Sequence, residues 1–391
     1  MTPTDCILCK ETITGQSMPE HVLLNALGGR TTVRDILCPR CNHEMGIGPD
    51  AALAKSTEFI RSICDFRAGD GGRAAMITGL SQGDTRFDLA PGMRARPRAP
   101  KPLDVTIDEN GISVSIEAYS EKEADRLVTG AATKIAKHLG HTDARVIEAI
   151  KQDLLKDKRT QYKPAPPIKQ QSDFGCDASQ RSMAKACLVL WAKLCGNVEV
   201  NGERFDAIRA FIRRATRGPD DTDFITLDTR AHPEAPAEFS RHPIFIWVGS
   251  DADGKVYGYF RLYGAVGWRF RLCSAGGRPD QSLCLVSNPF DNRVYDILKG
   301  AENFVDPTWI WEMAAATEID GAVMRQLSEL VALATERAHE RWSTDLVEET
   351  FGGIDDKDGE LSREQVDTFV KRFTAAVLAR HLQTAIDIDD V

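Results

Sequence analysis

The amino-acid sequence predicts an α+β protein, in which a small metal-stabilised module precedes a mixed region of helices and antiparallel strands. Two CxxC pairs lie within the first 41 residues. After residue 120 the apolar residues recur with helical spacing, and between residues 242 and 286 the spacing changes to the alternation typical of strands. Helices and strands that are segregated along a chain are typical of the α+β class. With 391 residues, of which 42% are hydrophobic, the chain is long enough for two or three domains.

The two cysteine pairs predict a structural zinc site. Cys6/Cys9 and Cys38/Cys41 each enclose two residues, and 28 residues separate the pairs. Two such knuckles can close a tetrahedron of four thiolates around zinc, and this closed shell leaves no open position for a substrate. The alternative is four reduced thiols packed as small apolar residues. The other six cysteines show no paired spacing, which fits a reducing compartment; they are Cys64, Cys176, Cys187, Cys195, Cys273 and Cys284.

The segment between the cysteine pairs carries a second signal. Residues 19–29 read PEHVLLNALGG, the second pair runs into Asn42 and His43, and residues 46–53 read GIGPDAAL. Over residues 4–55 this pattern resembles the HNH endonuclease family, in the subclass with two CxxC zinc knuckles. The resemblance implies a ββα-metal fold for the N-terminal module and hydrolysis of phosphodiester bonds in DNA.

The resemblance also implies roles for individual residues. His21 would be the general base that deprotonates a water molecule, a task suited to imidazole because its pKa lies near neutrality. Glu20 and Asn42 would hold a divalent cation, Mg²⁺ or Mn²⁺, which offsets the negative charge that develops on the phosphate. His43 competes with Asn42 for this ligand position, because one step along a helix turns the side chain by roughly a quarter turn.

Two positions leave alternatives open. Many HNH sequences carry a middle asparagine about five residues before the second CxxC pair, where this chain has Val33. Asp50 either lies behind the metal ligands or caps a helix that begins at Ala51. Val33 in place of the asparagine favours one alternative, a catalytically inactive zinc-stabilised module that binds nucleic acid or protein. A further alternative is an RNase, because hydrolysis with one metal ion does not itself distinguish the sugars.

The net charge of −9 argues against a protein that coats nucleic acid through bulk electrostatics. Contact with DNA would depend on local arginines, and Arg30, Arg34 and Arg40 lie within the motif. The basic residues within 94–101 and 204–217 are weaker candidates, because each group can instead belong to a linker or to a solvated helix face.

The chain also carries signals about its location and control. No stretch approaches the roughly 18 apolar residues of a membrane span, and the first residues lack a signal-peptide core, so we expect a cytoplasmic protein. Because an uncontrolled nuclease threatens its own genome, we expect control by a regulatory protein or ligand acting on the C-terminal region, or by a homo-oligomer. A role in antiviral defence against phage fits this expectation.

Three regions are expected along the chain: a nuclease module over residues 1–70, a Pro/Arg-rich connector over 71–102, and a regulatory or recognition region over 103–391 with a sub-boundary near 164–175. A hairpin through Asn110-Gly111 should open the third region, and an antiparallel meander should follow later. The predicted strands are 103–107, 112–117, 244–248, 256–262 and 266–273. The predicted helices are 120–139, 143–155, 178–194, 205–216, 320–339 and 362–383.

Two weaker patterns are interpreted as structural. Residues 354–361 resemble a calcium-binding loop, but Ile354 and Gln365 stand where an Asp and a Glu ligand are required. Ser362 and Gln365 instead match a helix capping box. His232 and His242 lack a partnered acidic constellation, so we expect them to be structural or exposed.

Overall fold

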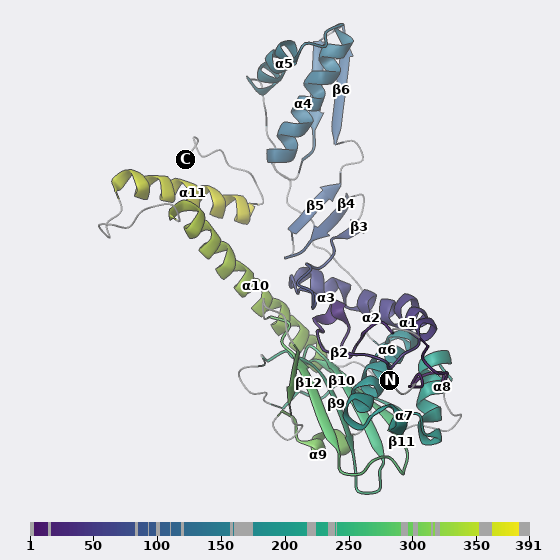
Figure 1. Cartoon of the computed structure of the whole chain (residues 1–391). Helices are drawn as coiled ribbons and strands as arrows, with labels where there is room; N and C mark the ends of the chain where they lie inside the picture. Colours follow the sequence, from purple (N-terminus) through teal and green to yellow (C-terminus); the bar gives the residue numbers. More distant parts are fainter. Residues whose placement is uncertain are drawn as a thin grey trace. The chain divides into compact units, whose positions relative to one another are not determined.

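The computed structural model describes residues 4–382, except residues 15–16, 83–84, 93, 99–101, 110, 119–120, 157–158, 160–174, 217–223, 234–238, 240, 291–295, 300–303, 314–315, 317–320 and 352–361. The chain divides into two compact units (Figure 1). Unit 1 combines Met1–Ala75 with Gln171–Arg337, and unit 2 combines Met76–Gln170 with Ala338–Val391.

The N-terminal part of unit 1 has the expected order of two strands and a helix. Strands β1 (Glu20–His21) and β2 (Thr32–Val33) pair antiparallel, with Glu20 opposite Val33. Four helical segments accompany them: η1 (Asn25–Leu27), α1 (Pro39–Met45), α2 (Ala51–Ser56) and α3 (Glu58–Ile63). A π-helical turn, η2 (Gly46–Asp50), joins α1 to α2 and contains Pro49, which has no N–H for a regular helical bond.

The Gly-Gly turn after η1 has a steric cause. Gly28 ends η1 in the left-handed region at φ 91°. A Cβ on Gly29 would lie 1.8 Å from the carbonyl oxygen of Leu23, so no side chain fits there. The Gly-Gly pair therefore lets the chain between β1 and β2 fold closely onto itself.

The rest of unit 1 is built on a six-stranded antiparallel sheet with the order β13-β12-β9-β10-β11-β8. Its strands are β8 (Ile225–Asp228), β9 (Ile244–Ser250), β10 (Val256–Leu262), β11 (Val266–Cys273), β12 (Ser282–Ser287) and β13 (Asp296–Lys299). The predicted meander is thus confirmed, and three further strands extend it. Along β9 every residue is buried: Ile246 and Val248 belong to one core, and Phe245 and Trp247 to another. Both faces of the sheet are therefore covered.

Helix α6 (Asp177–Cys195) covers the face of the sheet that carries Ile246 and Val248 (Figure 1). It contacts β9, β10, β11 and β12, and it also contacts η2 and α2 of the N-terminal module. Residues from Ser182 to Ala192 are all buried, because the helix lies between two layers. Shorter segments follow it: α7 (Asn197–Val200), η3 (Glu203–Phe205) and α8 (Asp206–Arg214), which packs against α6 and β11.

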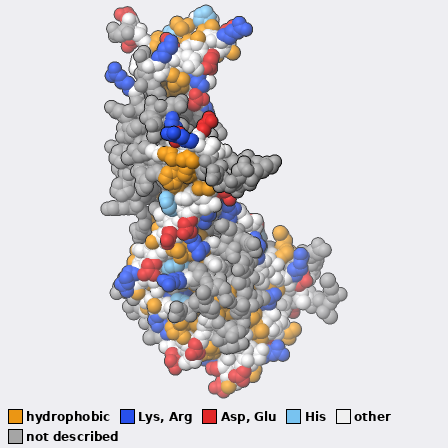
Figure 2. Space-filling view, turned by 90° about the vertical axis from the view of Figure 1, so that its left-hand side faces the viewer, with side chains coloured by type: hydrophobic (Ala, Val, Ile, Leu, Met, Phe, Trp, Pro, Cys, Tyr) orange, Lys and Arg blue, Asp and Glu red, His pale blue; other side chains and the backbone are white. Residues whose placement is uncertain are grey.

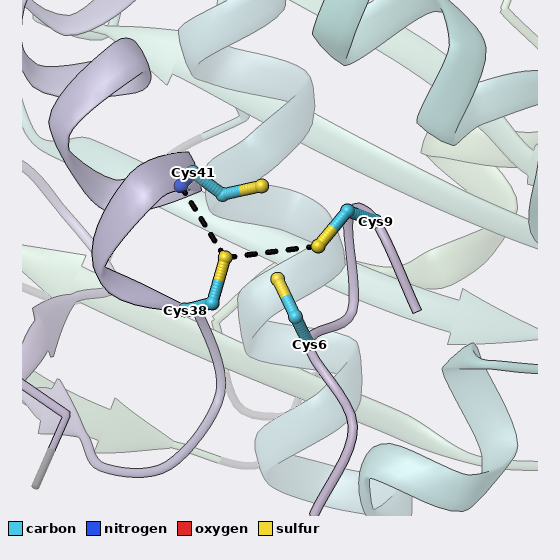
Figure 3. A group of neighbouring side chains, drawn as sticks. All are labelled: Cys6, Cys9, Cys38 and Cys41. Atoms are coloured by element: carbon cyan, nitrogen blue, oxygen red, sulfur yellow. Dashed lines mark hydrogen bonds between the residues drawn. The ribbon is translucent and has the colours of Figure 1, made fainter. Parts of the chain in front are cut away.

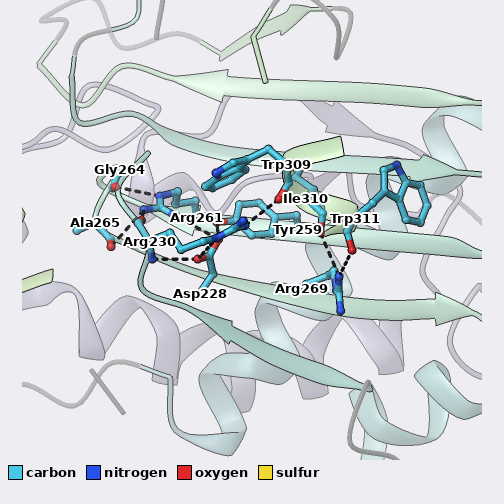
Figure 4. A network of polar contacts seen from close by, with 10 residues as sticks. All are labelled: Asp228, Arg230, Tyr259, Arg261, Gly264, Ala265, Arg269, Trp309, Ile310 and Trp311. Atoms are coloured by element: carbon cyan, nitrogen blue, oxygen red, sulfur yellow. Dashed lines mark hydrogen bonds and ion pairs between the residues drawn. The ribbon is translucent and has the colours of Figure 1, made fainter. Parts of the chain in front are cut away.

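A polar network holds α9 (Pro307–Trp311) against the sheet (Figure 4). Asp228, which is 1% exposed, accepts hydrogen bonds from Arg230 Nε at 2.9 Å and from the Tyr259 hydroxyl at 2.8 Å. Arg261 donates to Asp228 at 3.5 Å, and Arg269 donates to the carbonyl of Trp311 at 2.9 Å. Each charge in the network therefore has a partner, as burial requires.

Unit 2 begins with strands where we expected an extended connector. Strands β3 (Ile77–Gln82), β4 (Thr85–Ala90) and β5 (Arg94–Arg98) form a three-stranded antiparallel sheet. Phe87 and Leu89 of β4 are buried, which gives this segment a small core. Pro97 lies in β5, at the edge of the sheet, where a strand tolerates a missing N–H. The Pro- and Arg-rich composition predicted a linker. The segment folds as a sheet instead, because β4 supplies buried apolar side chains.

The other predicted elements of unit 2 are confirmed, and their bounds shift by one residue except in the helix predicted at 320–339, which extends to residue 351. The hairpin of β6 (Leu103–Asp108) and β7 (Gly111–Ile116) packs against α4 (Glu121–His138), which contacts α5 (Ala144–Lys156). Helix α10 (Gly321–Phe351) starts in unit 1 and is longer than expected, and α11 (Arg363–Leu382) follows. Ser362 and Gln365 exchange the two bonds of a capping box, at 2.7 and 3.2 Å. The calcium-like stretch at 354–361 and most of the boundary expected near 164–175 lie outside the described residues.

Candidate metal centre and nuclease site

The two cysteine pairs meet in one cluster (Figure 3). The Sγ atoms of Cys6, Cys9, Cys38 and Cys41 all lie within 4.8 Å of one another, and those of Cys9 and Cys38 are 3.6 Å apart. A Zn–S distance of about 2.3 Å in a tetrahedron places sulfurs roughly 3.7–3.8 Å apart, so the four thiols fit zinc. The pKa of Cys6 is lowered to about 4, chiefly by the hydrogen bond from Cys41. Among the described residues this is the only cluster of three or more His, Cys, Asp or Glu side chains suited to a metal.

A backbone hydrogen bond joins the two knuckles, and a side-chain cap begins the helix after the second knuckle. The amide of Ile7 donates to the carbonyl of Ile36 at 3.0 Å. Cys38 caps α1: its Sγ accepts from the amide of Cys41 at 3.4 Å, and Pro39 begins the helix. The cluster therefore sets the position of α1, and with it Asn42 and His43.

Glu20 and His21 have different surroundings, although they are neighbours in β1. Glu20 is 5% exposed, whereas His21 is half-buried. Successive strand residues point to opposite faces, which explains the difference. His21 lies near the loop that carries Asp70, whose pKa is lowered by hydrogen bonds from the Gly72 amide and Asn25 and, to a smaller extent, by His21.

A cluster of buried charges surrounds Glu20. The Nζ of Lys185, on α6, donates to Oε1 of Glu20 and to Oδ2 of Asp50, the latter at 2.7 Å. The hydroxyl of Ser182 donates to Oδ1 of Asp50 at 2.6 Å. Asp50 makes no side-chain bond to the start of α2, so it does not cap the helix, and it shares Lys185 with Glu20.

The charge of this cluster bears on whether Glu20 suits a cation. Two carboxylates and one ammonium leave one formal negative charge in excess. Burial raises the pKa of Glu20, and Lys185 only partly opposes this effect. Burial alone would lower the pKa of Lys185, but Asp50 and Glu20 outweigh burial and raise it. The raised pKa of Lys185 keeps its ammonium charged between the two carboxylates, and the one remaining formal negative charge fits a cation beside Glu20.

The remaining candidates lie on α1 and on the module surface. Asn42 is half-buried and His43 is exposed, as expected for successive helix positions. Arg30, Arg34 and Arg40 are all exposed. Arg30 donates to the carbonyl of Gly69 at 2.6 Å, and Arg40 pairs with Glu11 at 2.8 Å.

Several further residues near the site are not marked by a motif in the sequence. Asn25 donates to Asp70 at 3.1 Å and ties η1 to the loop after α3, and nothing in its local pattern marks it. Lys185 had a usable signal, because a lysine between Ala184 and Ala186 interrupts a segment that is otherwise apolar. His232 and His242 are structural: His232 packs on Phe245 at a ring distance of 5.1 Å, and His242 is 5% exposed.

Comparison with known proteins agrees with this geometry. Residues 6–58 match the family model described as HNH endonuclease, and they include the cysteine cluster, β1, β2 and α1. The N-terminal module is therefore a member of the HNH endonuclease family, which indicates a nuclease or nucleic-acid-binding function. No significant match was found among curated proteins or solved structures. None of the helices searched in the described part of the chain is long and apolar enough to cross a membrane.

Proposed function

We propose that the protein is a metal-dependent endonuclease that hydrolyses phosphodiester bonds in DNA, with zinc on its four cysteines as a structural ion. The observation that carries the proposal is the half-buried His21, which follows the buried Glu20 within the module matched by the HNH family. A more open imidazole beside a buried carboxylate suits a base that must reach water and substrate.

In this proposal His21 accepts the proton of the attacking water. A divalent cation, Mg²⁺ or Mn²⁺, supplies positive charge at the phosphate when it is bound. Glu20 and Asn42 are the residues that would hold it, with His43 as the alternative to Asn42 on the same helix. The excess negative charge around Glu20 supports this assignment.

In this proposal individual arginines make the contacts with DNA. On the face drawn in Figure 2, basic and acidic side chains are interspersed over the described surface. Arg30 and Arg34 are exposed between β1 and α1, so they are the first candidates for phosphate contacts. Such contacts weaken as salt rises.

We extend the proposal to the control of cutting. A nuclease with free access to its own genome would be harmful, so we place it in the cytoplasm under the control of a regulatory protein, a ligand or self-association, with defence against foreign DNA as its setting. A constitutive, full-rate nuclease would contradict this part of the proposal.

The test uses the full chain with supercoiled plasmid and with RNA, each in Mg²⁺, in Mn²⁺ and in EDTA. We expect the plasmid to be nicked or linearised only in a divalent ion, while tightly bound zinc stays constant. Plasmid that is bound but never cut would favour the inactive binding module. Val33, which stands in place of the middle asparagine, also favours that module. Cutting of RNA alone would favour the RNase.

A further inference from the structure

Lys185 is a buried cation that the family match does not cover, since the match ends at residue 58. Its side chain is 1% exposed, and it comes from α6, 165 residues away from Glu20 in sequence. It nevertheless contacts the carboxylate that precedes His21. A residue outside the matched module therefore contributes directly to the surroundings of the candidate site.

The arrangement around Lys185 is specific. A buried ammonium is costly unless partners replace its hydration, and here two carboxylates do so. Ser182 lies three residues earlier on the same face of α6 and binds the second oxygen of Asp50. Helix α6 thus holds Asp50 at both oxygens and Glu20 at Oε1.

We propose that Lys185 is a positioning residue of the nuclease site, which holds Oε1 of Glu20 so that the carboxylate beside His21 keeps one direction toward a divalent cation. This inference rests on the proposed function. Partners that hold a ligating carboxylate commonly matter for affinity, because they restrict the orientation of the ligand.

The simpler explanation is that Lys185 only joins the module to the sheet. A matched control separates the two roles. Arg209 on α8 is also a buried cation of unit 1, and it binds the carbonyls of Val200 and Gly202 and the carboxylate of Asp206 without touching Glu20. Arg209→Met removes a buried cation from the same unit and removes no contact of Glu20 or Asp50.

The experiment measures Mn²⁺ binding by electron paramagnetic resonance on the zinc-loaded full chain without DNA, and the unfolding midpoint of the same samples. We expect Lys185→Met to weaken Mn²⁺ binding about tenfold or more. Arg209→Met should bind Mn²⁺ within about twofold of wild type, even though its midpoint falls. Glu20→Gln combined with Lys185→Met should bind no worse than Glu20→Gln alone, because Lys185 acts through Glu20.

Wild-type affinity in Lys185→Met, tighter binding in that variant, or fully additive effects in the double variant would overturn the inference. If Lys185→Met does not fold, Lys185→Arg keeps the charge but changes its reach, and unchanged Mn²⁺ affinity there would overturn the inference equally. A wild type that binds Mn²⁺ and cuts DNA while Lys185→Met behaves identically defeats this inference alone. A wild type that neither binds Mn²⁺ nor cuts defeats the proposed function and the role of Lys185 together.

Discussion

The Nζ of Lys185 and the Oδ2 of Asp50 lie 2.7 Å apart, although 135 residues separate them in the sequence. Around this pair, one hydrophobic core joins Leu23 and Leu53 of the module to Leu188 of α6 and Ile246 of the sheet. The HNH module is therefore packed as part of unit 1.

This shared core predicts that the module is weak by itself. A fragment of residues 1–75 would expose the surface that α6 covers and leave Glu20 and Asp50 without Lys185. We expect the amides of α1 and α2 to be less protected from hydrogen exchange in the fragment than in the full chain. Equal protection in the fragment and the full chain would show that the module folds independently.

Loss of zinc should unfold the knuckles. Thiolate coordination supplies folding free energy to small metal modules, so Cys41→Ser should lower zinc content and stability together. Cys176→Ser is the matched control, because Cys176 is exposed and lies outside the cluster. The checks are metal analysis and thermal unfolding. Full zinc content in Cys41→Ser would contradict a four-cysteine site.

Asp228→Asn should destabilise unit 1 strongly. It removes the buried negative charge that pairs with Arg261, which is 0% exposed, and breaking such a pair costs about 3–5 kcal/mol. Asp253→Asn, in the exposed turn between β9 and β10, should change the free energy of unfolding by less than about 0.5 kcal/mol. Denaturant titration of both variants measures the difference, and similar small losses would mean that the network in Figure 4 contributes little.

His232 predicts a pH dependence of stability. Its pKa is lowered to about 4, first by burial and then by the nearby Arg261. Between about pH 4 and 6.5 the unfolded chain binds more protons at this site, so the free energy of unfolding rises with pH, by at most about 1.4 kcal/mol per pH unit. His232→Phe should remove this contribution and flatten the curve in that window. An unchanged slope would contradict the assignment.

Local features of the fold could be predicted from the sequence, whereas features that depend on packing could not. The cysteine pairs, the hairpin at β6 and β7, and strands β9 to β11 follow from spacing and turn residues that act over short distances. The hydrogen bonds from Lys185 and Ser182 to Asp50 could not be predicted, because local periodicity does not show that α6 is covered on both sides. The sheet of β3, β4 and β5 was missed for a related reason: its prolines and arginines indicated a linker, whereas Phe87 and Leu89 supply the buried face.

The central claim is that His21 is the base of a metal-dependent nuclease. Its most direct test compares plasmid cutting by wild type, His21→Ala and the control His141→Ala, which removes an exposed histidine after α4. Samples are assayed in Mn²⁺ and in EDTA, and zinc is measured in each. We predict that wild type and His141→Ala cut only in Mn²⁺, and that His21→Ala keeps its zinc but cuts at least about 100-fold more slowly. Cutting by His21→Ala at the wild-type rate, or cutting by any sample in EDTA, would contradict the claim.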